Sequence, residues 1–310
     1  MPEGDSVWRA ADKLHQALAG QVVTTSDFRV PRFATLNLAG WTMTEVVPRG
    51  KHLLMRLVGP EDTEPGASRK PRALTIHSHL KMEGSWMVYA PGGRWTRPGH
   101  TARCVLRTAV ADAVGFSLGI LEVVPTGEED KIVGHLGPDL LGPDWDEAEA
   151  LRRLQAEPDV PIGYALLNQR NLAGIGNIYR CDSCFLSGVH PALPVGQVPD
   201  LARIVRDAKR LLGENLGPGR RSTLGPRAMR PGYWVYGRTR QPCRRCGTPI
   251  QHGLLAAPDG TEERDIYFCP QCQPAPRGAE GTETGPAGPS RNAISGQRAS
   301  GRAARPRYGR

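Results

Sequence analysis

The chain has 310 residues, enough for two domains that each bury a core of their own. Forty Lys and Arg against thirty-one Asp and Glu give a formal charge of +9, a balance that suits a polyanionic partner as well as plain solubility. The composition excludes a disulfide scaffold, because the seven cysteines are few and clustered, and it offers neither an apolar membrane span nor a signal segment.

The first part of the chain predicts one helix followed by many short strands. Apolar residues recur at helical spacing between residues 5 and 19, namely Val7, Ala11, Leu14 and Leu18. Gly20 follows as a stop signal. From residue 22 to about 124 the pattern shortens to strand-like runs, of which the clearest are 52–58, 85–89 and 103–110. We therefore expect an antiparallel β-sandwich or barrel over residues 1–135.

The second part of the chain predicts helices and then a polar tail. A Gly- and Pro-rich segment, residues 136–146, reads as an interdomain linker. The helical domain is expected over residues 147–235, with helices at 146–156, 161–169, 177–187 and 199–215. Residues 274–310 contain almost no apolar side chains and so cannot offset the entropy of ordering. We expect them to be a disordered basic tail.

Four cysteines have the spacing of a zinc ribbon, which we place at residues 236–273. Two C-x-x-C pairs stand twenty-two residues apart, formed by Cys243, Cys246, Cys269 and Cys272. Such pairs can place four thiolates around one Zn²⁺, and four protein ligands make that zinc structural instead of catalytic. Pro249, Gly253 and Gly260 favour a hairpin between the pairs. A third pair, Cys181 and Cys184, has no second pair left to complete a metal site, so we expect these cysteines to be buried or neutral.

The stretch 168–180 places Gly174 and Gly176 immediately before Asn177, which could cap the helix that follows. Glycines let a backbone approach a ligand closely, and the free amides of a helix N-terminus bind phosphate oxygens. On a basic chain this pattern suggests a hairpin that grips a phosphate backbone. A tight turn between two helices is an equally common meaning of the same pattern.

Pro2 becomes a candidate nucleophile once Met1 is removed, because a free prolyl nitrogen is a secondary amine that can form an iminium with an aldehyde carbon. Glu3 directly behind it can donate or accept a proton. Many proteins begin Met-Pro, so Pro2 alone decides nothing. Its weight comes from the basic chain and the zinc ribbon that accompany it.

Together these features resemble one known family. The segments MPEGDSVWRAADKL, PRGKHLL, HLKMEGSW and LAGIGNIYR, followed by the ribbon, resemble formamidopyrimidine-DNA glycosylase and endonuclease VIII, in order along residues 1–273. The resemblance implies an α+β fold, with an N-terminal β-sandwich flanked by helices and a C-terminal helix-two-turn-helix domain. It also implies a monomeric base-excision repair enzyme of the cytoplasm and nucleoid, both DNA glycosylase and AP lyase, acting on damaged or abasic double-stranded DNA.

The resemblance assigns catalytic roles to matching residues. Pro2 matches the nucleophile that attacks C1′ of the damaged nucleotide, and Glu3 the acid that assists sugar opening and base release. Lys51 matches a lysine that supports elimination, although a lysine at a strand start is ordinarily just solvated. Arg264 matches the zinc-ribbon arginine that binds phosphate around the lesion.

The resemblance also implies DNA contacts. Met82, with Lys81 beside it, matches a wedge that fills the space left by a nucleotide turned out of the helix, and Asn177 matches a helix-capping residue that contacts a phosphate. Two departures matter. His135 stands where the family has another basic residue, and residues 111–120 lack the Arg of the Arg and Phe pair found in the branch that removes oxidised purines.

The opening segment is closer to the endonuclease VIII branch, so we expect oxidised pyrimidines as substrates. Two alternatives remain: the same fold acting on oxidised purines, and a non-catalytic protein that binds damaged DNA.

Overall fold

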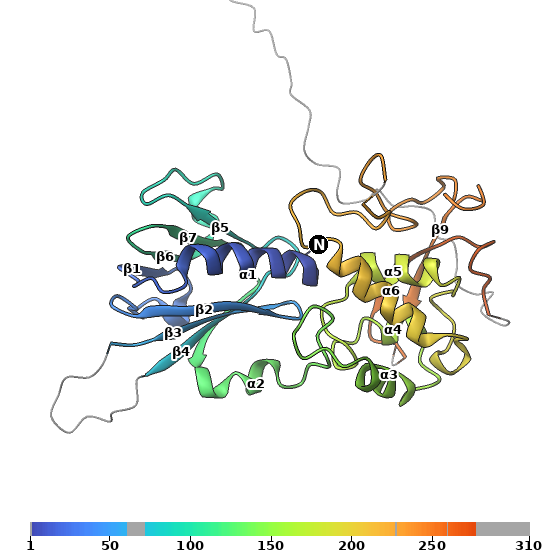
Figure 1. The fold of residues 1–310 in the computed structure, drawn as a ribbon, viewed down its shortest axis with the longest axis horizontal. Helices are drawn as coiled ribbons and strands as arrows, with labels where there is room; N and C mark the ends of the chain where they lie inside the picture. Colours follow the sequence, from blue (N-terminus) through green and yellow to red (C-terminus); the bar gives the residue numbers. More distant parts are fainter. Residues whose placement is uncertain (1, 61–71, 227, 259, 277–310) are drawn as a thin grey trace, which may run out of the picture.

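The computed structural model describes residues 2–60, 72–226, 228–258 and 260–276. The chain forms two units, with all the strands up to residue 125 in one and most of the later helices in the other (Figure 1). Nearly all of the tail predicted at 274–310 lies outside the described residues. The predicted domain limits stay predictions.

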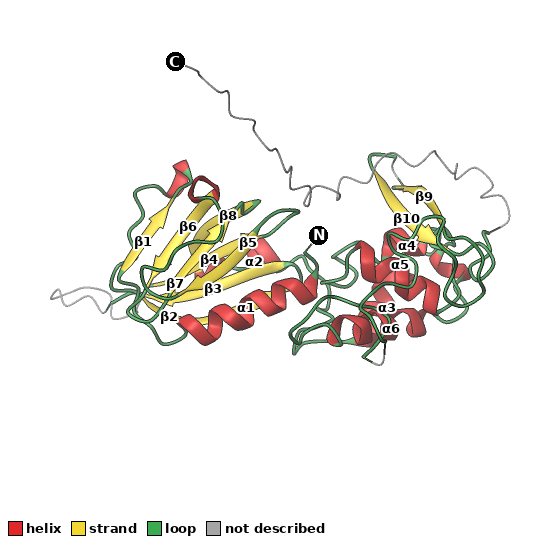
Figure 2. Cartoon of the chain, turned by 90° about the horizontal axis from the view of Figure 1, so that it is seen from above, coloured by secondary structure: helices red, strands yellow, loops and turns green. Residues whose placement is uncertain are grey.

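The N-terminal unit is a sandwich of two four-stranded antiparallel sheets, which confirms the predicted fold class (Figure 2). The first sheet has the order β1 (Thr25–Phe28), β6 (Ala102–Arg107), β7 (Asp112–Phe116), β5 (Ser85–Tyr89). The second has the order β2 (Thr42–Arg49), β3 (His52–Val58), β4 (Ala73–His79), β8 (Ile120–Pro125). Two of the predicted runs, 52–58 and 85–89, therefore coincide with β3 and β5.

The third predicted run, 103–110, is too long at its C-terminal end. The Thr108 hydroxyl accepts hydrogen bonds from the backbone amides of Val110 and Ala111, at 3.3 and 3.0 Å. These bonds close a turn, because a Thr side chain offers the backbone an alternative to the strand ladder. Strand β6 consequently ends at Arg107.

Helix α1 (Gly4–Leu18) covers one edge of the sandwich and contacts both β2 and β5. The four apolar residues predicted to share one face are each no more than 1 % exposed and join the core between the sheets. Gly20 adopts φ 77° just past the helix end, a left-handed conformation that favours glycine and explains the stop. The start of α1 points toward the second unit (Figure 1).

The C-terminal unit packs short helices around an apolar core. Its helices are α3 (Glu147–Gln155), α4 (Ile162–Ala165), α5 (Asn177–Leu186) and α6 (Leu201–Gly213), with α2 (Asp130–Val133) in the connection before them. Three of them match the predicted ranges to within about two residues, whereas α4 is shorter than the predicted 161–169. The chain turns after Leu166 because Asn168 and Asn171 bond to backbone groups, at Arg170 N and Ala165 O.

The last described residues form the predicted hairpin, β9 (Gln251–Ala256) and β10 (Glu263–Phe268), paired antiparallel. Four 3₁₀ turns complete the described elements: η1 (Pro31–Phe33), η2 (Gly99–Thr101), η3 (Thr126–Glu128) and η4 (Val195–Gln197). Among the described residues, the search for a helix long and apolar enough to cross a bilayer gives no candidate.

Candidate active site at the junction of the two units

Glu3 belongs to the first unit but caps a helix of the second. Its carboxylate is fully buried and accepts hydrogen bonds from the backbone amides of Gly176 and Ile178, at 2.8 and 2.9 Å. These amides are unpaired donors at the start of α5, where the positive end of the helix dipole also favours a carboxylate. A Cβ on Gly176 would lie 2.4 Å from Glu3 Cδ, so glycine is what allows this approach.

The predicted capping role of Asn177 is therefore wrong. Asn177 is the first residue of α5, and the cap residue, Gly176, has no side chain. The Asn177 Nδ2 instead donates to the backbone carbonyl of Asp265 in β10 at 3.0 Å, and its Oδ1 accepts from Arg180. Glu3 takes the capping position, although it lies 173 residues from Gly176 along the chain. Asn177 ties α5 to the hairpin that carries Arg264.

The glycine-rich stretch also makes a backbone contact with the first unit. Gly174 has φ 102°, and its carbonyl accepts a 2.9 Å hydrogen bond from the Gly4 amide. A Cβ on Gly4 would lie 3.0 Å from Gly174 Cα. The stretch is a turn between α4 and α5, and two amides at its end, those of Gly176 and Ile178, donate to the Glu3 carboxylate. A grip on a phosphate backbone stays a prediction.

Lys51 lies on a turn that the interdomain connection holds in place. The turn joins β2 and β3 through Gly50, which has φ 58°, and the Gly50 amide donates to Asp139 Oδ2 at 2.6 Å. Arg49 pairs with Asp144 at 3.0 Å. Asp139 thus supports the turn that carries Lys51, a role that no sequence motif indicates. The Gly-Pro-Asp segment around it predicts only a break between domains.

Glu3 and Lys51 perturb each other. Burial raises the pKa of Glu3, while the charges of Lys51 and Arg221 oppose that rise. Burial lowers the pKa of Lys51, with Arg264 acting in the same direction and Glu3 opposing it. Each group is therefore closer to its neutral form than it would be in water, a state suited to proton transfer. Arg264 of β10 therefore lies close enough to Lys51 for its charge to lower the pKa of that lysine.

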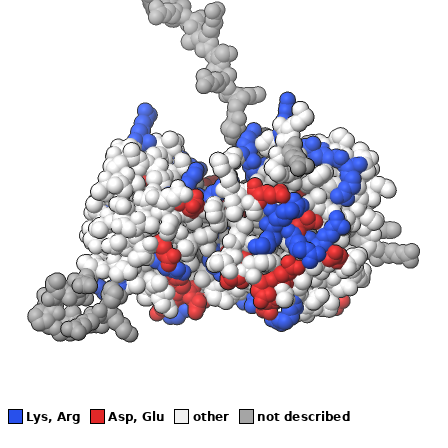
Figure 3. All heavy atoms as spheres, viewed as in Figure 1, with Lys and Arg blue, Asp and Glu red and all other residues white. Residues whose placement is uncertain are grey.

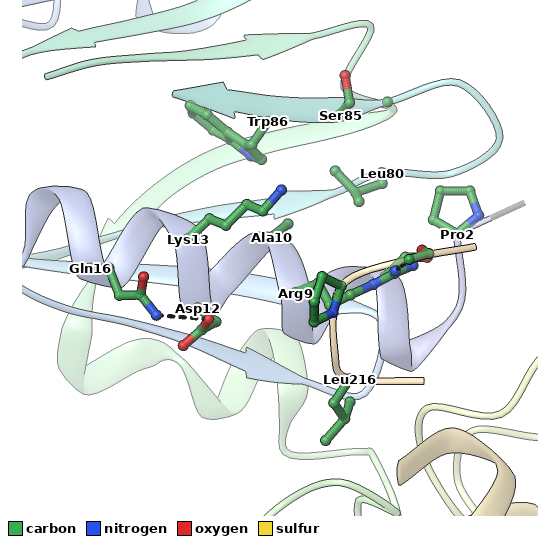
Figure 4. Close-up of a pocket in the computed structure, with 14 residues that line it drawn as sticks. Pro2, Arg9, Ala10, Asp12, Lys13, Gln16, Leu80, Ser85, Trp86 and Leu216 are labelled. Atoms are coloured by element: carbon green, nitrogen blue, oxygen red, sulfur yellow. Dashed lines mark hydrogen bonds between the residues drawn. The ribbon is translucent and has the colours of Figure 1, made fainter. Parts of the chain in front are cut away.

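Pro2 borders a cavity of about 540 Å³ between α1, the turn after β4 and residues 216–219. Figure 4 shows the Pro2 ring at one end of this cavity, with Arg9 and Lys13 of α1 along one side and Trp86 opposite. An amine nucleophile needs open space through which its substrate can approach, and the cavity provides that space beside Pro2. The next residue, Glu3, is held by the amides at the start of α5. The cavity is polar at α1 and apolar at Leu80 and Trp86.

The remaining predicted DNA contacts lie around this centre. Met82 is 63 % exposed in the turn that joins β4 to β5, and Lys81 in the same turn is exposed with φ 51°. Met82 is thus neither in a strand nor in the core, as a methionine in that pattern would ordinarily be. His135 is exposed, with its ring 6.4 Å from that of His52, the neighbour of Lys51. Arg264 is exposed on β10 and pairs with Glu262 at 2.6 Å.

The four ribbon cysteines converge on one point. Their sulfur atoms all lie within 4.8 Å of one another: Cys243, Cys246, Cys269 and Cys272. A tetrahedral zinc with bonds of about 2.3 Å needs sulfur atoms about 3.8 Å apart, so the cluster fits a metal ion of this kind. Cys181 and Cys184 are fully buried in α5 as predicted, and burial raises the pKa of both thiols.

Much of the positive charge on the C-terminal helices is locally neutralised. Figure 3 shows cationic and anionic side chains intermingled over this unit. On α6, Arg210 pairs with Asp207 and Glu214 at 2.9 Å each, and Arg206 pairs with Glu147 at 3.1 Å. Such exposed pairs form a solvated helix face. The cations whose charges act on Glu3 or Lys51 are instead Lys51, Arg221 and Arg264.

Comparison with known proteins gives consistent results. Residues 1–117 match the model of the formamidopyrimidine-DNA glycosylase N-terminal domain. The chain is 51 % identical to "Probable endonuclease 8 2" of Streptomyces coelicolor, over 92 % of this chain and 98 % of that protein. It is 44 % identical to "DNA-(apurinic or apyrimidinic site) lyase Nei2" of Mycolicibacterium smegmatis, over 89 % and 100 %.

The fold is also that of solved relatives. Lactococcus lactis Fpg, in complex with DNA containing N7-benzyl-Fapy-dG, superposes with a TM-score of 0.68 at 24 % identity, over 88 % of this chain and 100 % of that one. The chain belongs to the formamidopyrimidine-DNA glycosylase and endonuclease VIII family, in its endonuclease VIII branch.

Proposed function

We propose that this protein is a bifunctional DNA glycosylase and AP lyase of base-excision repair, with Pro2 as its nucleophile. The observation that carries the proposal is the placement of Pro2 at an open cavity directly beside a buried, doubly hydrogen-bonded Glu3. A protein that only binds DNA has no need for this arrangement of an amine and an acid. The relatives named as endonuclease 8 and as an AP lyase support the same activity.

The reaction follows from these groups. With Met1 removed, the Pro2 nitrogen attacks C1′ of a nucleotide turned out of the helix, and the bond from C1′ to the base breaks as the base leaves with a proton. Glu3 supplies a proton to the ring oxygen, which opens the sugar and leaves an iminium between Pro2 and C1′. The iminium acidifies the C2′ proton, and its removal expels the 3′ phosphate by β-elimination. A second, δ-elimination then expels the 5′ phosphate.

Lys51 and Arg264 act around that centre. The lowered pKa of Lys51 leaves more of its amine in the neutral form than in a solvated lysine, and only the neutral form can accept a proton during elimination. Arg264 can bind a phosphate beside the lesion, because its guanidinium is exposed on β10 near Lys51. We assign a phosphate contact to Asn177, further DNA contacts to Lys81 and His135, and the filling of the vacated base position to Met82.

The ribbon cysteines would hold one Zn²⁺ in a structural role. The ion, when bound, cross-links the two ends of the β9–β10 hairpin, since Cys243 and Cys246 precede the hairpin and Cys269 and Cys272 follow it. The hairpin then presents Arg264 and the Asp265 carbonyl at a fixed place beside α5. The partner is damaged or abasic double-stranded DNA, and solved Lactococcus lactis Fpg complexes contain DNA with N7-benzyl-Fapy-dG or with an abasic site. We expect the protein to bind it as a monomer.

We further propose oxidised pyrimidines as the preferred lesions. Only residues 117–119 connect β7 and β8, which leaves little room for a loop that carries an Arg and Phe pair over a purine. Side-by-side excision from duplexes with thymine glycol or 8-oxoguanine tests this preference. Release of 8-oxoguanine without pyrimidine activity would favour the oxidised-purine alternative.

Borohydride trapping on abasic-site DNA tests the proposed function itself, because reduction converts the iminium into a stable covalent adduct. We expect the processed, zinc-loaded protein to form it, Pro2→Gly to form much less, and a chain that retains Met1 to form none. The Lys131→Gln variant, which removes an exposed cation of α2, serves as a control and should trap like the wild type. Absence of any adduct with the wild type would leave the non-catalytic binding protein as the better account.

A further inference from the structure

A buried cluster of charges lies directly behind the nucleophile. Asp5, in the first turn of α1, has a side chain with no exposed surface, and Arg221 of the second unit is 11 % exposed at its side chain. The Arg221 guanidinium donates to both carboxylate oxygens of Asp5, at 2.7 and 2.9 Å, and also to the Ser6 hydroxyl. This is a two-pronged ion pair, the most directional kind of charged contact.

Arg221 is itself held by the second unit. Its guanidinium lies 5.6 Å from the ring centre of Tyr179 in α5. Two residues along, the Thr223 hydroxyl donates to the buried Asp182 of α5, which also accepts from the amides of Trp234 and Val235 at 2.8 and 3.0 Å. The segment around Arg221 is therefore anchored to α5 independently of its contact with Asp5.

A second contact ties the same segment to α1. Arg9 donates to the Gly219 carbonyl at 3.2 Å and pairs with Asp5 at 3.4 Å. Arg9 and Gly219 both line the cavity that Pro2 borders. Asp5 and Ser6 are three and four residues after Pro2, so whatever fixes them also fixes the direction in which Pro2 enters the cavity.

We propose that Arg221 is a positioning residue for the reaction: by gripping Asp5 and Ser6 it fixes the first turn of α1, and with it Pro2 and Glu3, against the second unit. The inference rests on the function proposed above. A buried ion pair adds little net stability compared with well-packed apolar side chains, so its use here is geometric. Nucleophilic attack needs such geometry, because a displacement of about 1 Å can cost about 100-fold in rate.

The test uses Arg221→Gln and Arg221→Lys in the full-length, zinc-loaded protein. With enzyme in excess over abasic DNA, we expect Arg221→Gln to form the borohydride adduct about 100-fold more slowly than wild type. Its affinity for a duplex with an uncleavable abasic analogue should change less than about threefold, because the Arg221 side chain is largely buried and paired with Asp5. Arg210→Gln, which breaks exposed pairs on α6, is the matched control and should behave as wild type.

The pH profile separates positioning from mere stability. The positive charge of Arg221 lowers the pKa of Glu3, so Arg221→Gln should move the alkaline limb of base release to higher pH. Arg221→Lys keeps the positive charge but loses the two-pronged guanidinium contact with Asp5. The alkaline limb of base release should therefore return to its wild-type pH, while adduct formation stays slow. The inference would be overturned if Arg221→Gln formed the adduct at the wild-type rate. It would also be overturned if the adduct rate fell only in proportion to the fraction of folded protein and the alkaline limb did not move. If the wild-type protein formed no adduct, that result would contradict the proposed function instead.

Discussion

The contact between Gly176 and Glu3 gives the sharpest prediction, for the substitution Gly176→Ala. The new methyl carbon would lie 2.4 Å from Glu3 Cδ and 2.6 Å from Glu3 Cγ. Atoms cannot approach so closely, so the Glu3 side chain must move. The movement breaks or lengthens its hydrogen bonds to the amides of Gly176 and Ile178, while the carboxylate stays inside the protein.

The cost follows from the number and kind of bonds. A hydrogen bond to a charged group contributes about 1.5 to 3 kcal/mol, so complete loss of both would cost about 3 to 6 kcal/mol. The Glu3 side chain can rotate and keep part of this bonding. We therefore expect the free energy of unfolding to fall by about 2 to 4 kcal/mol. Base release should slow by about 10- to 100-fold, because the acid no longer faces the sugar.

Urea unfolding at pH 7 measures the first quantity, and single-turnover release from a lesion-bearing duplex measures the second. Gly213→Ala is a matched control, because a Cβ there meets nothing within 4 Å at the end of α6. That control should be neutral or more stable by up to about 1 kcal/mol. A Gly176→Ala protein within about 0.5 kcal/mol of wild type, with unchanged base release, would refute the capping role of Glu3.

Three further predictions concern other parts of the molecule. His52→Phe should flatten the stability profile below pH 6.5: burial lowers the pKa of His52 to about 3, so the unfolded chain binds the extra proton and wild-type stability falls as pH drops from 6.5. Urea titrations at pH 7 and pH 5 measure this, and parallel losses in both proteins would contradict it. Arg264→Gln should weaken binding to a lesion duplex and reduce the slope of log affinity against log salt by about one unit. An unchanged slope would argue against a phosphate contact. Chelation of zinc, or Cys243→Ser, should unfold the β9–β10 hairpin and abolish DNA binding, as measured by circular dichroism and gel shift. Unchanged spectra and an unchanged gel shift after chelation would contradict this.

Local signals determined much of the fold from the sequence. The apolar period of α1 and the stop at Gly20 locate the helix, because helical spacing and a left-handed glycine are properties of neighbouring residues. The spacing of the two C-x-x-C pairs likewise predicts the cluster of four cysteine sulfur atoms that the structure contains. Predictions failed where a side chain bonds to nearby backbone, as at Thr108 and Asn168, because such turns compete with periodic structure without changing the apolar pattern.

The sequence by itself supplied the candidates for the proposed chemistry: the amine of Pro2, the acid of Glu3, the lysine at 51 and the four thiols. Only the tertiary structure decided how they meet. Glu3 replaces Asn177 as the cap of α5, and Arg221 reaches Asp5 across 216 positions of the chain. No periodicity or short motif encodes such contacts, because they depend on how two separately packed units come together.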